Sequence, residues 1–245
     1  MNKKSQDEKI QEDYYSQTAA QYDSLHLGSA DPEHEIALHV MLGLCRRYQF
    51  SSFLDVGAGT GRTLIRLLEE FPNAEIHGIE PVEQLREIAY SKGISPLILS
   101  DGNGTNLAFP DNSYDLVTAF GILHHIRHPN DCIIEMLRVA KSAIFISDLN
   151  NFGCGGLLQR FLSQSLRKLG LWKAFQFLKT NGKMYKISEG DGLFYSYSVF
   201  DSLSLIHENC SKVFLLNTAG LGGFPYKNCS HVALLGIKNS PVVTN

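Results

Sequence analysis

A glycine-rich turn follows a short apolar run and has the residue types needed to hold a ligand through the backbone. Phe53–Val56 (FLDV) is typical of a strand, and Gly57–Gly61 (GAGTG) follows it directly. Glycine at 57 and 59 permits a tight strand-to-helix turn and close approach of a ligand, since a Cβ would obstruct both. Ligands of open α/β sheets bind beyond the carboxyl ends of the strands, so a ligand site is predicted at this turn.

Acidic residues end three successive predicted strands at the same edge. Asp55 lies beside the turn, Glu80 ends the second strand 25 residues later, and Asp101 follows the third. A dinucleotide fingerprint requires GxGxxG, but Arg62 occupies its last glycine position. Asp55 would repel a pyrophosphate but can accept from an ammonium group, directly or through water. Glu80 is placed to accept from two ribose hydroxyls, and Asp101 from an adenine amino group. The combination favours S-adenosylmethionine as the cofactor, with a dinucleotide as the alternative.

Two histidines follow the fourth predicted strand, near the expected position of the cofactor methyl group. His124 or His125 could act as the base for an acceptor hydroxyl, or both could pack at the start of the next helix. His124 and His128 have i, i+4 spacing, but Pro129 follows at once and no third ligand is close in sequence, so no metal site is expected. Asp148, after the fifth strand, is expected to face the same rim and contact the acceptor.

Strands and helices alternate along the chain, which predicts an α/β fold with a doubly wound, largely parallel sheet. Helices are expected over 10–22 and from the N-cap Asp31 with Pro32 at the first helical position. After residue 150 the alternation stops, and it resumes with a helix at 198–209 and a closing hairpin of residues 213–216 and 232–237. The turn-rich stretch 219–225 joins the two hairpin strands. Strands are expected over 53–56, 76–79, 96–99, 114–120 and 143–147.

These motifs resemble those of a known family. Phe53–Gly61 is similar to motif I of the class I S-adenosylmethionine-dependent methyltransferases, and Gly78–Pro81 is similar to motif II. Phe109–Val117 and Leu123–Ile126 resemble the region around strand four in the type 11 small-molecule branch. That branch continues RVLKPGG into strand five, whereas this chain reads RVAKSAI at 138–144 without the proline-glycine turn, so the substrate class of close relatives does not transfer directly.

The resemblance implies a Rossmann-like, seven-stranded, mostly parallel sheet of order 3-2-1-4-5-7-6, with the last strand antiparallel. The interruption of the strand–helix alternation after residue 150 predicts a helical cap inserted after strand five. Tyr14 or Tyr22 is expected to close over the cofactor. The positions that the resemblance assigns to cofactor binding are Asp55, Gly57, Ala58, Gly59, Gly61, Glu80, Pro81, Asp101, Gly102 and Phe120.

The insertion at about 150–197 is the region expected to select the acceptor. Residues 151–196 hold seven basic and two acidic side chains among many apolar ones. Three interpretations stay open: a packed helical cap, a binding surface for an anionic acceptor, and a basic amphipathic segment resting on a membrane. Trp172 and Tyr195 are the candidates for acceptor contact.

Bulk properties exclude some classes of protein. The net charge of −3 and pI of about 6.3 argue against general nucleic-acid binding. The cysteines are scattered without a CxxC pair, as in reduced cytoplasmic proteins.

Taken together, the motifs and composition lead us to expect a disordered tail at 1–9 and one cytoplasmic methyltransferase domain at 10–245. Its expected reaction is O-methylation of a small, anionic, sugar- or carrier-linked acceptor. A membrane-surface enzyme with a lipid-linked acceptor and a non-catalytic cofactor-binding protein are the alternatives.

Overall fold

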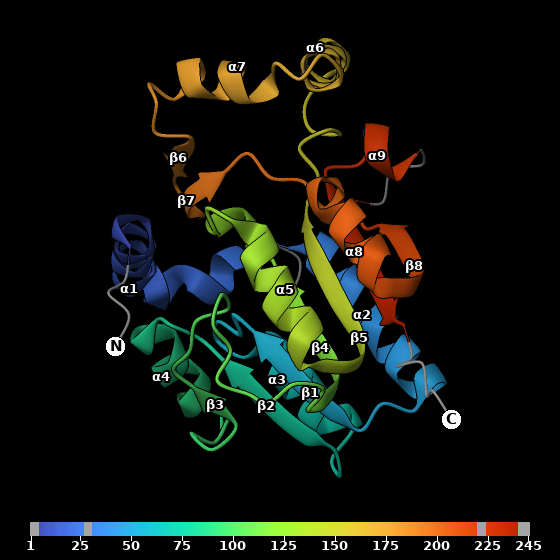
Figure 1. The fold of residues 1–245 in the computed structure, drawn as a ribbon. Coiled ribbons are helices and arrows are strands. Elements are labelled where there is room, and N and C mark those ends of the chain that lie inside the picture. The colour runs from blue at the N-terminus through green and yellow to red at the C-terminus, as the bar shows by residue number, and fades with distance from the viewer. Residues whose placement is uncertain (1–4, 27–30, 220–223, 240–245) are drawn as a thin grey trace.

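The computed structural model describes residues 5–26, 31–219 and 224–239, and a seven-stranded sheet runs through its centre (Figure 1). The strand order is β3-β2-β1-β4-β5-β9-β8. The pairs from β3 to β5 are parallel, whereas β9 is antiparallel to both β5 and β8. Counted without the cap strands β6 and β7, this is the expected order 3-2-1-4-5-7-6, which is confirmed. The sheet strands are β1 (Ser52–Val56), β2 (Glu75–Ile79), β3 (Leu99–Ser100), β4 (Tyr114–Phe120), β5 (Ala140–Leu149), β8 (Cys210–Asn217) and β9 (His231–Lys238).

Helices cover both faces of the sheet. On one face Leu38 and Leu64, from α2 and α3, join a buried cluster with Phe145 of β5. On the other, Ile133 of α5 and Ile206 of α8 pack with the opposite side chains of the same strands. The helices are α1 (Gln6–His26), α2 (Pro32–Tyr48), α3 (Arg62–Glu70), α4 (Glu83–Ser91), α5 (Pro129–Val139), α8 (Leu203–Asn209) and α9 (Pro225–Asn228), with short 3₁₀ turns η2 (Leu123–His125) and η3 (Val199–Ser202).

The ends of these elements follow local chemistry. Asp31 caps α2 by accepting from the His34 backbone N–H at 3.4 Å, and Pro32 opens the helix, as predicted. The glycine turn ends at Gly61, whose φ of 89° caps α3 in a conformation that side chains disfavour. The predicted helix at 198–209 is divided into η3 and α8, and Ser198 forms a capping box with Asp201.

The cap follows β5 and lies beyond its carboxyl end, at the top of Figure 1. It contains α6 (Leu157–Lys168) and α7 (Trp172–Lys179), and then a hairpin of β6 (Tyr185–Ser188) and β7 (Gly192–Tyr195). The cap expected after strand five is therefore present with two helices, and a hairpin completes its second half. Within the described part of the chain, none of the helices combines the length and the hydropathy that crossing a bilayer requires.

Two further boundaries differ from those expected. Helix α1 begins at Gln6 instead of residue 10, so it starts within the tail expected at 1–9. Strand β3 covers only residues 99–100 instead of 96–99, because residues 95–98 form a turn in which the Ile98 N–H donates to the Ser95 carbonyl. Residues 220–223 of the predicted turn lie outside the described residues.

Candidate cofactor site and cap cleft

The glycine turn is held close to two other elements. Backbone N–H groups of Gly57 and Ala58 both donate to the Ile79 carbonyl at 2.9 Å, which fixes the turn against the end of β2. Gly57 has a φ of +72°, and a Cβ there would lie 2.5 Å from Cγ2 of Ile122. This position therefore requires glycine for both its backbone conformation and its packing. The turn presents its backbone at the carboxyl edge of the sheet, as predicted.

Glu80 is buried under the turn. One carboxylate oxygen accepts from the Gly59 N–H and the other from the Val82 N–H, both at 2.9 Å. Burial raises the pKa of this carboxyl to about 7, although those two hydrogen bonds lower it. Each oxygen keeps a second acceptor position. Glu80 therefore lies beside the turn with capacity for further donors, while its neighbour Pro81 leads the chain toward α4.

Asp55 lines a small cavity together with Tyr22, Gly57 and Phe120. The Thr118 hydroxyl donates to Asp55 at 2.6 Å, and burial raises the pKa of Asp55 to about 6. A buried acid that faces a cavity suits a cationic ligand group. Sequence reasoning missed the hydrogen bond from Thr118 that holds the Asp55 side chain. The two residues lie side by side because Thr118 of β4 pairs with Asp55 of β1 in the sheet.

Asp101 and Gly102 occupy different surroundings from those expected. Asp101 is exposed, forms a 3.1 Å ion pair with Arg86, and is not among the residues that line the cavity. Gly102 packs on Ile79, where an added Cβ would lie 2.8 Å from the isoleucine side chain. The interpretation of Asp101 as an adenine contact therefore stays a prediction, and Gly102 has a packing role in the chain as described.

Helix α1 covers the turn. The Tyr22 hydroxyl lies over Gly59, at 2.9 Å from the position that a Cβ would occupy. Asp23 accepts from the Thr60 hydroxyl at 2.5 Å and pairs with Lys92 at 2.6 Å, which fastens the end of the helix. Tyr14, in contrast, accepts from the Gly190 N–H at 2.6 Å and so contacts the cap. Of the two tyrosines expected to close over the cofactor, Tyr22 is the one in position.

Because α1 lies over the glycine turn, little room is left there for a ligand. The cavity lined by Asp55 and Tyr22 measures about 20 Å³, whereas ligand pockets usually measure about 300–1,000 Å³. The residues fit a nucleoside-amino acid cofactor by chemistry, because they offer backbone N–H groups and two buried carboxylates. Such a cofactor fits by size only if Tyr22 and its helix move outward.

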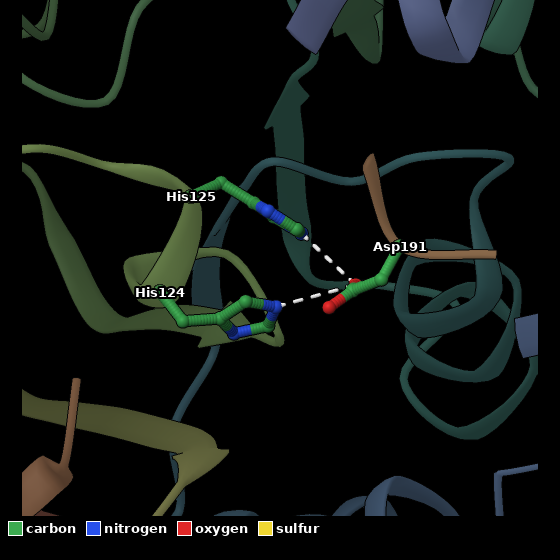
Figure 2. Close-up of side chains that lie close together, drawn as sticks. All are labelled: His124, His125 and Asp191. Atoms are coloured by element: carbon green, nitrogen blue, oxygen red, sulfur yellow. Dashed lines mark hydrogen bonds and ion pairs between the residues drawn. The ribbon is translucent and has the colours of Figure 1, made fainter. Parts of the chain in front are cut away.

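A group of polar side chains lies next to this cavity. His124 Nδ1 donates to Asp148 at 2.7 Å. On the other side of the ring, His124 Nε2 lies 3.4 Å from Asp191, and Figure 2 shows this contact. Burial would lower the pKa of His124, but the two carboxylates outweigh it and raise this pKa. Asp148 is fully buried and also accepts from the Leu123 N–H at 2.8 Å. Asp148 is therefore enclosed and orients His124, and its contact with an acceptor stays a prediction.

His125 is engaged on both ring nitrogens. Nδ1 lies 2.7 Å from the Leu193 carbonyl, and Nε2 lies 3.1 Å from the Tyr15 hydroxyl and 3.4 Å from Asp191. Burial, together with the neighbouring His124, lowers the pKa of His125 to about 4. Since neither histidine offers a free nitrogen to an acceptor, the geometry gives no support to a general base at either position.

Sequence reasoning missed Asp191 and Tyr15. Asp191 lies 67 positions after His124 along the chain, and no periodicity connects the two. The available signal was the motif Gly190-Asp191-Gly192, an acid in a turn, which marks a loop that can reach another element. Tyr15 lies edge-on to both Tyr22 and His125, with ring centroids 5.5 and 5.8 Å away. It connects the covering helix with the histidines.

A separate cleft of about 740 Å³ opens beneath α6 and α7. Trp172, a candidate for acceptor contact, lines it and donates from Nε1 to the Ser196 hydroxyl at 3.1 Å. Tyr195 does not: neighbouring strand residues point to opposite faces, so Phe194 and Ser196 line the cleft while the Tyr195 hydroxyl donates to Asp7 of α1. Other apolar lining residues are Leu158, Leu162, Leu166 and Phe175.

The basic residues of the cap serve different purposes. Lys179 and Lys186 line the cleft. Arg167 instead forms a 3.0 Å ion pair with Asp201, and its guanidinium lies over the Phe152 and Trp172 rings at 3.8 and 4.5 Å. Arg167 therefore fastens the cap to the core, which leaves the lysines as the cations available to a ligand.

Known proteins share both the motifs and the fold. Residues 54–146 match the family model described as "Methyltransferase domain". A demethylmenaquinone methyltransferase of Deinococcus radiodurans is 38% identical over 90 residues, which cover 35% of this chain and 37% of that protein. Ajmaline N-methyltransferase of Rauvolfia serpentina is 29% identical over 105 residues, 41% of this chain and 36% of that protein. Alignments with the first curated relatives thus span little more than a third of those proteins, 37% and 36%.

A solved structure is similar over nearly the whole chain. The magnesium protoporphyrin IX methyltransferase of Synechocystis, crystallised with bound S-adenosylhomocysteine, superposes with a TM-score of 0.63 at 14% identity. The superposition covers 95% of this chain and all of that one. The fold is the one that this methyltransferase of known structure has. Residues 54–146 carry the family match, and the type 11 resemblance of the sequence is confirmed.

Proposed function

We propose that this chain transfers a methyl group from S-adenosylmethionine to a small molecule that binds in the cap cleft. The observation that carries the proposal is the pairing of two sites of unlike chemistry at one edge of the sheet. One has the glycine turn with the buried acids Asp55 and Glu80, and the other is an apolar cleft of about 740 Å³ with lysines.

Each residue at the turn has a defined part in holding the cofactor. Glu80 accepts from the ribose hydroxyls, and Asp55 accepts from the ammonium of the methionine end, directly or through water. Tyr22 and the rest of α1 exclude water from the reacting methyl group. When bound, S-adenosylmethionine supplies an electrophilic methyl on a sulfonium sulfur.

We further propose that the acceptor atom is an oxygen that is already ionised or readily ionised, as in a carboxylate or a phenol. His124 and His125 are both engaged, so an acceptor that needs no base fits this site best. The apolar lining of the cleft suits a hydrophobic body, and Lys179 and Lys186 suit an anionic group on it.

The test starts with cofactor binding by calorimetry. The full chain binds S-adenosylmethionine and S-adenosylhomocysteine; binding of NAD in their place would overturn the proposal. Transfer of a labelled methyl group to a panel of aromatic and aliphatic carboxylic acids and phenols is then measured. The Phe194→Asp variant keeps cofactor binding and loses transfer. Tight cofactor binding without transfer to any class of acceptor would instead support a non-catalytic cofactor-binding protein.

A second candidate, a methyltransferase that works at a membrane surface, is favoured by the outer face of the cap. Exposed apolar side chains that do not line the cleft gather on α6 and α7, notably Phe161, Phe177 and Leu178, which are 68%, 56% and 75% exposed. Exposed lysines lie on the same helices at 168 and 173. Such a face matches the interface of an anionic bilayer.

Vesicle sedimentation separates this candidate from the first. A membrane-surface enzyme binds phosphatidylcholine vesicles that contain phosphatidylserine, and added salt weakens the binding. Phe161→Asp with Leu178→Asp abolishes it. Leu97→Asp is the matched control, since Leu97 is 86% exposed and lies outside the cap. Equal binding by both variants, or none by the unmodified chain, would eliminate this candidate.

A further inference from the structure

Three potential metal ligands converge where the cap returns to the core. His124 Nε2, His125 Nε2 and an oxygen of Asp191 all lie within 4.8 Å of one another (Figure 2). The two histidines belong to η2, after β4, and Asp191 belongs to the turn between β6 and β7. The group therefore joins two parts of the chain that are far apart in sequence.

Both imidazoles are already oriented for ligation. His124 Nδ1 lies 2.7 Å from an Asp148 oxygen, and His125 Nδ1 lies 2.7 Å from the Leu193 carbonyl. The Asp148 carboxylate only accepts, so His124 Nδ1 carries a proton and donates to it. His125 Nδ1 also has the Gln11 amide nitrogen 3.1 Å away, but its shorter contact is with the Leu193 carbonyl, to which it donates. In the neutral ring this leaves the Nε2 lone pair directed at the third ligand. Metal-binding histidines show the same support, with the second nitrogen donating to a carboxylate or a carbonyl.

Two of the three separations between the ligand atoms also suit an ion, and the third is within 4.8 Å. Both Nε2 atoms lie 3.4 Å from the Asp191 oxygen. Ligands at about 2.0–2.1 Å from a tetrahedral zinc ion are separated by about 3.4 Å. A direct charged hydrogen bond between imidazolium and carboxylate is shorter, at about 2.7–2.9 Å. Two imidazoles with one carboxylate select a divalent transition metal over magnesium or calcium.

We propose that His124, His125 and Asp191 bind a divalent transition metal ion, with zinc as the best match, and that Asp148 positions His124 for it. A fourth position is left for water or for the Tyr15 hydroxyl, which lies 3.1 Å from His125 Nε2 and gives up that hydrogen bond when the ion binds. The ion fastens the cap turn to the core. His124 and His128 have no third ligand near them in sequence, whereas the third ligand of this site comes from the cap.

This proposal does not depend on methyl transfer, so it is tested by metal binding alone. Tag-free full-length protein is stripped with a chelator and titrated with zinc by calorimetry, and cobalt is added separately to record its visible spectrum. We expect one equivalent of zinc, a tetrahedral cobalt spectrum and a higher melting temperature with metal. Asp148→Asn lowers zinc affinity about 10- to 100-fold, as loss of an orienting partner does.

The variants decide between a metal site and a hydrogen-bonded group. Asp191→Asn, on a partly exposed turn, removes the anionic ligand with little risk to folding and abolishes the stoichiometric binding. His128→Ala, an exposed neighbour in the same loop, leaves it unchanged. Zinc binding that survives in Asp191→Asn overturns the assignment of ligands. A folded parent chain that binds no zinc overturns the site, and His124 is then a cation held between two carboxylates.

Discussion

The two ligand regions of this chain differ in the room that they leave. The cavity beside the glycine turn measures about 20 Å³ and is lined by charged and polar groups, whereas the cleft under the cap measures about 740 Å³ and is lined mostly by apolar ones. One site is complete in its chemistry but closed by α1, and the other is open. Entry at the first therefore requires motion, while binding at the second requires only complementary shape and charge.

The largest effect is expected from removing the carboxylate of Glu80 beside the glycine turn. Glu80→Ala is expected to weaken binding of S-adenosylmethionine by at least about 100-fold, because two hydrogen bonds to a charged group contribute about 3 kcal/mol or more. Calorimetry at pH 8 measures the change. Glu83→Ala, exposed at the start of α4, serves as the control.

The cost to folding must be separated from this effect on binding. The Ala variant leaves the N–H groups of Gly59 and Val82 without their acceptor, and each buried unpaired group costs about 1–3 kcal/mol. Circular dichroism must therefore show a folded chain before the calorimetry is interpreted. A folded variant with unchanged affinity would show that Glu80 supports the turn but does not bind the cofactor.

Ligand binding in the cap cleft is tested by introducing a charge among its lining residues. Phe194→Asp is expected to weaken binding of anilinonaphthalene sulfonate, an apolar ring system with an anionic group, by about 30-fold. Loss of contact with one aromatic side chain corresponds to about 2 kcal/mol. Fluorescence titration gives the affinity. Phe177→Asp, on α7 but not in the cleft lining, should bind the probe like the parent. Equal loss in both variants would place the probe on the outer face.

The closed site should also respond to pH in a way that the cleft does not. Burial raises the pKa of Glu80 from 4.5 to about 7. If only the carboxylate binds ribose, cofactor affinity rises about tenfold between pH 6 and pH 8. In the chain without cofactor the sign is opposite. A carboxyl whose pKa is raised by folding contributes stability below its unfolded pKa and loses that contribution as pH rises through about 7.

Glu80→Gln separates this titration from that of other groups. Its cofactor affinity should be flat between pH 6 and pH 8, and its melting temperature should lack the part of the pH dependence that Glu80 supplies. A tenfold rise in affinity that persists in this variant would assign the titration to another group, such as Asp55, whose pKa burial raises to about 6.

The two regions also differ in how well the sequence predicts them. The cofactor site is local: a strand, a turn and the acid ending the next strand all lie between Ser52 and Glu80, and parallel pairing places them together. Its positions could therefore be predicted from motifs alone. Asp101 is the exception, since whether a residue after a short edge strand points inward depends on packing that a motif does not encode.

The cap and the histidine group depend on contacts between distant segments. Tyr195 and Phe194 are equally aromatic, and only the pairing of β6 with β7 decides which one reaches the cleft. Asp148 ends a strand just as Glu80 does, but η2 folds over it and buries it. Asp191 meets His124 only because the cap returns at that point. No periodicity in the sequence carries this information.

The smallest expected effect concerns the contacts of Asp23 that hold α1 over the glycine turn. Asp23 accepts from Thr60 and pairs with Lys92 across a partly exposed contact, 39% and 25% exposed. Partly exposed ion pairs contribute at most about 1 kcal/mol. Asp23→Asn should therefore speed cofactor association about fivefold, because less free energy is needed to lift α1 from the turn. Stopped-flow tyrosine fluorescence measures this rate, since Tyr22 must leave Gly59 as the cofactor enters.

Asp13→Asn is the matched control for this step, because Asp13 lies on the same helix and is exposed. It should leave the association rate unchanged. An unchanged rate in Asp23→Asn as well would mean that opening of α1 does not limit entry. The contrast between a closed cofactor site and an open cleft would then describe the resting chain only, and the cleft would have no kinetic advantage over the turn.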